Sequence, residues 1–425
     1  MPTKQPAFYG WTILVVAWFA YGFSISPGYY SWSIVSPSIV ADLGLSREQA
    51  GTILGLFIFL LGAVAPLVGV AINRYGARVV IPLGCLISGT GFVLMSRADS
   101  YLDCILSFSI LGGVGIAFAS QVPTQTLAAN WFTRYRARAM GLILTAGGVV
   151  GKAVPYADQY LMERESWRLV WIVAACIAGT LAIATFLLVR NRPSDLGQFP
   201  DGEKGSYPQD KSVKAPEDDS GASARNERQP SGMTLRQALR TPQFYVLCFA
   251  GMACTMPYNV VASHGLFHFA DIGFDPAVAA GMIGTMALFS VFGRLIGALG
   301  DLIRPIKLLG VALIFMGAAM AVLLSTKSSS VAGLAIMIFA IGHGLSYTSS
   351  YAVFPTFFGV GSFSTMAGTM GLVAGTGGFL ATRLTGRAYD QTGSYQTAFT
   401  TVVAIIIVIG LIALFTRPPR NASAL

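Results

Sequence analysis

The sequence contains few charged residues. Only 11% of its 425 residues are Asp, Glu, Lys or Arg, whereas 54% are hydrophobic, and the mean hydropathy is +0.63. A soluble domain carries about 25% charged residues, so this composition excludes a soluble protein. Apolar stretches of about 20 residues recur along the chain, which is the length that a helix needs to cross a bilayer. The sequence therefore predicts an all-α protein that crosses the membrane many times.

Cysteine and histidine are also scarce. The five cysteines lie in apolar segments without ligand spacing, so we expect neither disulfides nor a metal site. No nucleotide-binding or catalytic motif is present, so we expect no cofactor and no enzyme. The N-terminal segment lacks a small-residue cleavage site, and we expect no cleavable signal peptide. The net charge of +9 comes from basic clusters between apolar stretches, which argues against nucleic acid as a partner.

Hydropathy divides the chain into two sets of six spans around a polar segment. The first set is expected at 10–34, 49–72, 79–96, 102–127, 137–161 and 167–189, and the second at 243–268, 276–299, 306–325, 331–355, 364–387 and 395–416. Residues 191–240 are rich in Pro, Gly, Ser and charge, so we expect a disordered cytoplasmic linker with a short interfacial helix at "MTLRQALR". The linker would join an N-terminal bundle, 1–190, to a C-terminal bundle, 241–425.

Basic residues indicate the orientation of the spans. Arginines or lysines follow spans two, four, six, eight and twelve, and such loops face the cytoplasm. We therefore expect both termini in the cytoplasm and the chain in the plasma membrane, as in a bacterial inner membrane. Arg383 and Arg387, near the outer end of span eleven, are exceptions to this pattern.

The two halves repeat each other. "PAFY" at 6–9 matches "PQFY" at 242–245, Gly69-x-x-x-Asn73 matches Gly297-x-x-x-Asp301, and "MGLILTAGG" matches "MGLVAGTGG". Their nearly equal separations indicate a duplicated six-helix unit rather than small residues that recur by chance. Parallel six-helix repeats suit a transporter in which two bundles rock around a central site.

The loop "GVAINRYGAR", which begins at Gly69, resembles the loop between spans two and three of the major facilitator superfamily. Arg74, Gly76 and Arg78 match the pattern, whereas Asn73 stands where the family has an acid. The resemblance implies a fold of twelve transmembrane helices in two pseudo-repeats, and it implies loops that lock one conformation. In this chain the implied gate residues are Gly69, Asn73, Arg74, Gly76, Arg78, Gly297, Asp301 and Arg304.

Three further segments resemble a narrower group, the monocarboxylate transporter family and its oxalate/formate-exchanger relatives. They are "GWTILVVAWFAYGFSIS" in span one, "NWFTRYRARAMGLILTAGGVVG" around span five, and "SHGLFHFADIGFD" at the end of span seven. This resemblance implies a transporter of small organic anions.

Arg294 is the leading candidate for substrate binding. A central arginine costs roughly 2.5–3.5 kcal/mol on insertion scales, and its planar fork matches a carboxylate. It lies about 10 Å along the helix from Asp301, so snorkelling to the cytoplasmic surface is the alternative role. The resemblance implies a substrate-binding arginine at this place. Ser290 stands where human-type monocarboxylate carriers have an Asp, which puts their proton route in doubt here.

Other polar residues within spans are weaker candidates. Lys152 is either an anion ligand or a structural partner, for example of Asp158. His264 matches the span-seven histidine of the family and is a candidate ligand or proton site, with Asp158 the next proton-coupling candidate. The neutral candidates, which could equally bond a neighbouring helix, are Tyr21, Gln121, Tyr258, Asn259 and Tyr347.

The sequence as a whole favours proton-coupled monocarboxylate transport by alternating access, with a monomeric transport unit. The first alternative is an organic anion exchanger that holds a dicarboxylate between Arg294 and Lys152. Drug efflux is a weaker alternative, because it needs no cation deep in the membrane.

Overall fold

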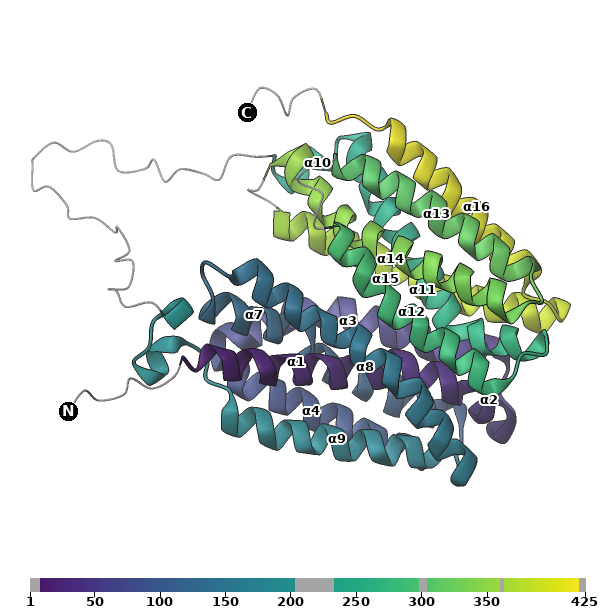
Figure 1. Cartoon of the computed structure of the whole chain (residues 1–425), viewed down its shortest axis with the longest axis horizontal. Coiled ribbons are helices and arrows are strands. Elements are labelled where there is room, and N and C mark those ends of the chain that lie inside the picture. Colours follow the sequence, from purple (N-terminus) through teal and green to yellow (C-terminus); the bar gives the residue numbers. More distant parts are fainter. Residues whose placement is uncertain (1–7, 203–232, 298–303, 360–362, 420–425) are drawn as a thin grey trace, which may run out of the picture.

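The computed structural model describes residues 8–202, 233–297, 304–359 and 363–419. Every element in these ranges is a helix. The helices form two bundles that lie side by side and are shown in purple to teal and in green to yellow (Figure 1). The expected all-α, two-bundle architecture is confirmed.

The N-terminal bundle contains the first six spans. Its first and fourth spans are interrupted by π-helical turns, and the others are single α-helices. The elements are α1 (Gly10–Ser26), η1 (Pro27–Ser31), α2 (Trp32–Leu43), α3 (Arg47–Tyr75), α4 (Ala77–Met95), α5 (Tyr101–Cys104), η2 (Ile105–Gly112), α6 (Gly113–Ala119), α7 (Gln121–Trp131), α8 (Arg136–Arg164) and α9 (Trp167–Leu188). Two short 3-10 turns follow, η3 (Pro193–Leu196) and η4 (Pro200–Gly202).

The C-terminal bundle begins after the expected linker, most of which lies outside the described residues. Its elements are α10 (Leu235–Ala238), α11 (Pro242–Asp271), α12 (Pro276–Gly297), α13 (Pro305–Ser325), α14 (Ser329–Phe358), α15 (Phe363–Thr392) and α16 (Gln396–Phe415). The short helix α10 lies within the segment expected to be helical, and the Thr234 side chain caps its N-terminus.

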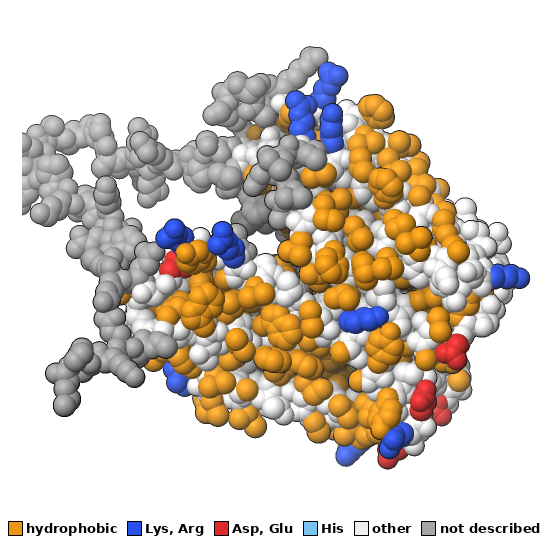
Figure 2. Space-filling view, in the orientation of Figure 1, with side chains coloured by type: hydrophobic (Ala, Val, Ile, Leu, Met, Phe, Trp, Pro, Cys, Tyr) orange, Lys and Arg blue, Asp and Glu red, His pale blue; other side chains and the backbone are white. Residues whose placement is uncertain are grey.

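Eleven helical segments of the described chain are long and apolar enough to cross a membrane. The twelfth span is α15, which packs against α3 and α11 and carries Arg383 and Arg387 in its C-terminal part. Hydrophobic side chains cover the middle of the visible face, whereas most charged side chains lie toward its ends (Figure 2). This distribution matches a bilayer-spanning protein.

The first span is longer than the sequence predicted, because it ends at Leu43 rather than near residue 34. Gly44 ends the helix in the left-handed conformation, with φ of 61°. The π-helical turn at Pro27–Ser31 allows the span to continue past Pro27. At Gly28 an added Cβ would lie 2.1 Å from the Phe57 ring, so only glycine fits between this turn and α3.

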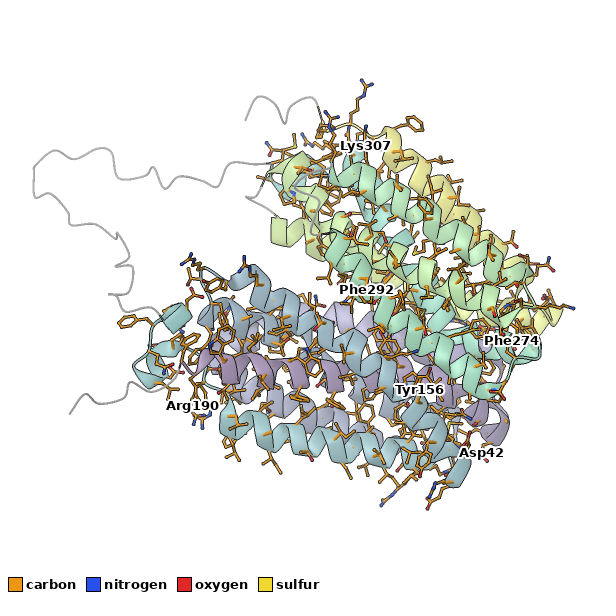
Figure 3. All side chains as sticks on the ribbon, viewed as in Figure 1. Asp42, Tyr156, Arg190, Phe274, Phe292 and Lys307 are labelled. Atoms are coloured by element: carbon orange, nitrogen blue, oxygen red, sulfur yellow. The ribbon has the colours of Figure 1, made fainter. Side chains whose placement is uncertain are left out.

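The two bundles touch at one end and diverge toward the other (Figure 1). Contacts between them join α3 to α15, α8 to α12, and α2 to α11. Figure 3 shows Arg190 and Lys307 at the diverging end, which we call the linker end, and Asp42 and Phe274 at the opposite end, which we call the closed end.

Candidate functional site

Arg294 lies in the part of α12 nearest the linker end, and a close helix crossing fixes its position. An added Cβ on Gly344 of α14 would lie 1.9 Å from the Ser290 carbonyl oxygen and 2.8 Å from the Arg294 backbone nitrogen. An added Cβ on Gly293 would lie 2.1 Å from the Ile341 carbonyl oxygen. Glycines on both helices therefore let the two backbones meet, which holds Arg294 in place.

The side chain of Arg294 is half-buried among four tyrosines, which we call the tyrosine cluster. They come from both bundles, namely Tyr21 of α1, Tyr30 of η1, Tyr258 of α11 and Tyr347 of α14, and all four lie near the guanidinium. The guanidinium carbon lies 5.2 Å from the centre of the Tyr347 ring. The Tyr30 and Tyr258 hydroxyls are 2.9 Å apart, which links the bundles at the site.

The Arg294 guanidinium has an unused donor. Its Nε atom is enclosed and has no hydrogen-bond partner. Among the described residues, no carboxylate forms an ion pair with Arg294. A charge inside the membrane ordinarily pairs with an opposite charge or contacts water. The site is therefore a fixed cation with a free N–H group, which is the chemistry that binds an anion.

Lys152 is not part of the tyrosine cluster. Its ammonium lies 2.9 Å from the Thr285 hydroxyl, 3.2 Å from the Tyr156 hydroxyl and 3.4 Å from the Gly281 carbonyl oxygen. Thr285 precedes Arg294 by nine residues of α12, or about 13 Å along the helix. Figure 3 places Tyr156 where α8 meets α12, away from the linker end. Lys152 thus joins the two bundles at their seam and does not pair with Asp158.

The two proton-coupling candidates also lie away from Arg294. His264 is fully buried near the closed end, where Nε2 is 2.8 Å from the Thr382 carbonyl oxygen and Nδ1 is 3.4 Å from the Tyr395 hydroxyl. Asp158 is buried in α8, and its Oδ2 atom has no hydrogen-bond partner. In this conformation the structure brings neither residue to the tyrosine cluster.

The two neutral amides expected at the site differ in their surroundings. Gln121 is exposed at the start of α7. Asn259 is buried, and its side-chain nitrogen would be 2.6 Å from a Cβ added at Gly378 of α15. Of the predicted binding residues, the structure therefore gathers Arg294, Tyr21, Tyr258 and Tyr347.

The expected gate loop of the first half contacts its own bundle. Gly76 ends α3 with φ of 76°, and the Arg78 backbone nitrogen donates to Asn191 Oδ1 at 2.9 Å. Arg78 Nε donates to the Phe186 carbonyl of α9, whereas Asn73 and Arg74 are exposed. The hydrogen bonds of Arg78 therefore stay within the N-terminal bundle, consistent with the divergence of the bundles at the linker end.

The second gate loop is described only at its edges. A Cβ added at Gly297 would overlap the Thr348 hydroxyl. A Cβ added at Gly69, the counterpart of Gly297 in the first half, would stand in open space. Arg304 is exposed before α13. Asp301 lies outside the described residues.

An ionic network that the sequence did not reveal joins the bundles at the closed end. Arg47, at the start of α3, forms a bidentate ion pair with Asp271 of α11, with N–O distances of 2.8 and 3.1 Å. Arg47 also donates to the Tyr395 hydroxyl at 2.9 Å and lies over the Tyr389 ring, 3.9 Å from its centre. These contacts hold α3 against the C-terminal bundle.

Two further contacts extend this network, which we call the closed-end network. Arg383 of α15 pairs with Glu48 at 2.9 Å, and the Asp390 carboxylate accepts hydrogen bonds from the backbone N–H groups of Arg47 and Glu48. Asp390 thus binds the N-terminus of α3, where the helix dipole favours an anion. The Glu48 carboxylate accounts for Arg383, one of the two basic residues that departed from the charge pattern. Its position at the wrong end of a span was the one available sequence signal.

The family profile of the Major Facilitator Superfamily matches residues 17–382. Monocarboxylate transporter 2 of Meriones unguiculatus is 24% identical over 96% of this chain and 84% of that protein. Monocarboxylate transporter 13 of Bos taurus is 25% identical over 94% and 87%. In the same fold, the crystal structure of a bacterial homologue of the human lysosomal transporter Spinster, inward-facing and occupied, gives a TM-score of 0.70 at 16% identity, covering 99% of this chain and 98% of that one.

The chain shares its two-bundle architecture with membrane transporters, and the relatives that it matches are transporters and not enzymes. It belongs to the major facilitator superfamily, since the family profile spans most of its length.

Proposed function

We propose that the protein transports small monocarboxylates, with Arg294 as the carboxylate anchor. The enclosed, unpartnered Nε atom of Arg294 carries this proposal. A carboxylate can accept from Nε and from a terminal nitrogen of the same fork, so one substrate would satisfy the free donor and neutralise the charge. The similarity to monocarboxylate transporters supports the same substrate class.

Charge neutralisation at Arg294 explains why transport would need the substrate. Closing the bundles around a bare guanidinium would remove a charge from water without compensation, which costs several kcal/mol. A bound carboxylate offsets that cost, so the loaded site can close and reopen on the other side. The tyrosine cluster contains residues of both bundles, so an anion bound at Arg294 would contact both of them.

The linker end corresponds to the cytoplasm in this proposal. Basic residues such as Arg74, Arg190 and Lys307 lie there, as the positive-inside rule requires. The structure would then be inward-facing, with the closed-end network sealing the outside. Transport would require this network to open while the bundles meet at the linker end.

The placement of Lys152 favours a monocarboxylate over a dicarboxylate. A dianion needs two cations within its own length, whereas Lys152 contacts α12 about 13 Å from Arg294 along the helix. The anion exchanger therefore remains the second candidate, and it would require a conformation in which Lys152 leaves Thr285.

Proton symport is the coupling that we propose. A proton that accompanies a monocarboxylate makes an electroneutral cargo, which avoids the cost of moving an anion against an inside-negative potential. His264 and Asp158 are the proposed proton sites, since both are buried titratable groups between or beside the bundles.

Uptake into proteoliposomes tests the proposal. Labelled monocarboxylates and dicarboxylates of increasing length would be offered to the purified protein, with and without a pH gradient that is acidic outside the vesicles. We expect saturable uptake of short monocarboxylates that a pH gradient drives. Uptake that depends on preloaded counter-anion and ignores the pH gradient would establish the exchanger instead, and no uptake of any carboxylate would reject the proposed substrate class.

A further inference from the structure

We infer that Tyr395 is a positioning residue that couples protonation of His264 to opening of the closed end. The inference rests on His264 as a proposed proton site, and it names the residue through which the charge of that site would act on the bundles. Tyr395 directly precedes α16 and is only 3% exposed. Its hydroxyl lies between His264 of α11 and Arg47 of α3, so it joins a buried histidine to the closed-end network.

The hydrogen bonds around the Tyr395 hydroxyl run in one direction. His264 Nε2 lies 2.8 Å from the Thr382 carbonyl oxygen, which can only accept, so Nε2 carries the proton of a neutral ring. Nδ1 is then an acceptor, and the Tyr395 hydroxyl, 3.4 Å away, donates to it. The same hydroxyl accepts from Arg47 Nη1 at 2.9 Å, and this nitrogen also donates to Asp271. The closed conformation is therefore matched to a neutral His264.

A protonated His264 would break this chain of hydrogen bonds. Nδ1 would become a donor, so the buried proton of the Tyr395 hydroxyl would lose its acceptor, which is unfavourable. The hydroxyl oxygen would also face two cations, His264 and Arg47, which repel each other in an enclosed place. Arg47 can relieve both conflicts by moving away, because it belongs to the other bundle. Protonation should therefore weaken the contacts that hold α3 against the C-terminal bundle.

Opening of the closed end would also give His264 access to water. The ring is fully buried, and the backbone of α3 covers it. A Cβ added at Gly51 of α3 would lie 2.9 Å from His264 Nε2 and 2.4 Å from the Thr382 carbonyl oxygen. If protonation favours the open conformation, opening favours protonation by the same factor. Acid on this side of the membrane should therefore stabilise the conformation that is open at the closed end.

The charged groups around His264 belong mainly to the closed-end network. Arg47 of α3 and Asp390 of α15 lie near the ring. His268 and Asp271 follow on α11 itself, and Asp271 pairs with Arg47. Arg47 is therefore the cation that a protonated His264 would repel. The titratable residues of the other helices that pack on α11 have their own partners or lie at the Arg294 site and the linker end, namely Glu48 with Arg383, Asp42 with Arg168, Arg294, His343, Tyr347, Tyr351 and Lys307.

The distance between the bundles at the closed end, measured against pH, tests this coupling. Pulsed electron paramagnetic resonance would use spin labels at Glu165→Cys and Lys327→Cys, one on each bundle, with the exposed Cys176 replaced by Ser. The pH would be lowered from about 8 to about 5, which stays above the range in which ordinary carboxylates titrate. The measurement uses no substrate, so its result does not depend on the proposed carboxylate uptake, which the proteoliposome assay tests separately.

Four variants separate the relay from its surroundings. Tyr395→Phe keeps the ring but loses the hydroxyl between His264 and Arg47. Tyr389→Phe is its matched control, because the Tyr389 ring also lies against Arg47. His264→Gln removes the titrating ring, and His268→Gln is its control, because His268 contacts the Leu323 carbonyl oxygen instead.

In wild type, the ratio of open to closed molecules should rise by up to about tenfold per pH unit below about pH 6.5, which is the limit for one linked proton. Tyr389→Phe and His268→Gln should show the same response, whereas His264→Gln should show none and Tyr395→Phe should lose most of it. Wild-type distances that do not change with pH would overturn the inference even if no variant folds. A full response in Tyr395→Phe, or one that is lost in His268→Gln and kept in His264→Gln, would also overturn it.

Discussion

Removing the Asp271 charge should open the closed end of the protein. Asp271→Asn breaks the bidentate ion pair with Arg47. The Arg47 side chain is 19% exposed and the Asp271 side chain is 32% exposed. A hydrogen bond to a charged group contributes about 1.5–3 kcal/mol, and an exposed pair contributes less than about 1 kcal/mol. Because the pair is partly buried and bidentate, we expect it to stabilise the closed conformation by about 2 kcal/mol.

The pair exists only while the closed end is sealed, so its loss acts on the balance between conformations. About 2 kcal/mol corresponds to roughly a 30-fold shift toward the conformation that is open at this end. The remaining contacts of Arg47, with Tyr395 and Tyr389, and the Arg383–Glu48 pair should keep some molecules closed.

Pulsed electron paramagnetic resonance can measure this shift. Spin labels at Glu165→Cys and Lys327→Cys would report the distance between the two bundles at the closed end, with Cys176, the exposed native thiol, replaced by Ser. Asp42→Asn is the matched control, since Asp42 pairs with Arg168 inside the N-terminal bundle. Asp271→Asn should populate longer distances and the control should not. The same distance distribution in Asp271→Asn and wild type would refute the role of the closed-end network.

Three further substitutions test the roles of Lys152, His264 and the crossing of α12 with α14. Lys152→Gln should leave monocarboxylate competition within a few-fold of wild type, whereas selective loss of dicarboxylate binding would favour the exchanger. His264→Gln should flatten the pH dependence of uptake but retain counterflow, and an unchanged pH profile would transfer the proton role to Asp158. Gly344→Ala should lower stability by about 1–3 kcal/mol in thermal unfolding, because its Cβ would overlap α12. Gly179→Ala, with open space at its Cβ, is the control, and an equal effect of both changes would contradict the close crossing.

The sequence predicts most of the fold, because hydropathy and charge act over whole spans. Eleven expected spans agree with the observed helices to within several residues, since their ends are set by local signals such as the Ser46 capping box that begins α3. The first span exceeded its prediction because polar residues and Pro27 interrupt its apolar run. Tertiary packing of the π-helical turn, not local propensity, continues that helix.

The site was less predictable, since its partners come from distant segments. Arg294 stands out in sequence as a cation within an apolar run. Nothing local shows that Tyr30 meets Tyr258 across the bundles, or that the Lys152 ammonium reaches Thr285 rather than Asp158.

If a substrate carboxylate pairs with Arg294, its affinity must depend on the guanidinium, and the affinity of Arg294 variants measures this dependence. Binding of a short monocarboxylate would be measured by competition in wild type, Arg294→Ala, Arg294→Lys and the control Arg164→Ala, which changes an exposed arginine beside Tyr160 at the closed end. Loss of a desolvated charge pair costs about 2–5 kcal/mol, so Arg294→Ala should weaken binding by 30-fold or more. Arg294→Lys should also bind poorly, because an ammonium cannot reproduce the fork. Wild-type affinity in a well-folded Arg294→Ala protein would contradict the account.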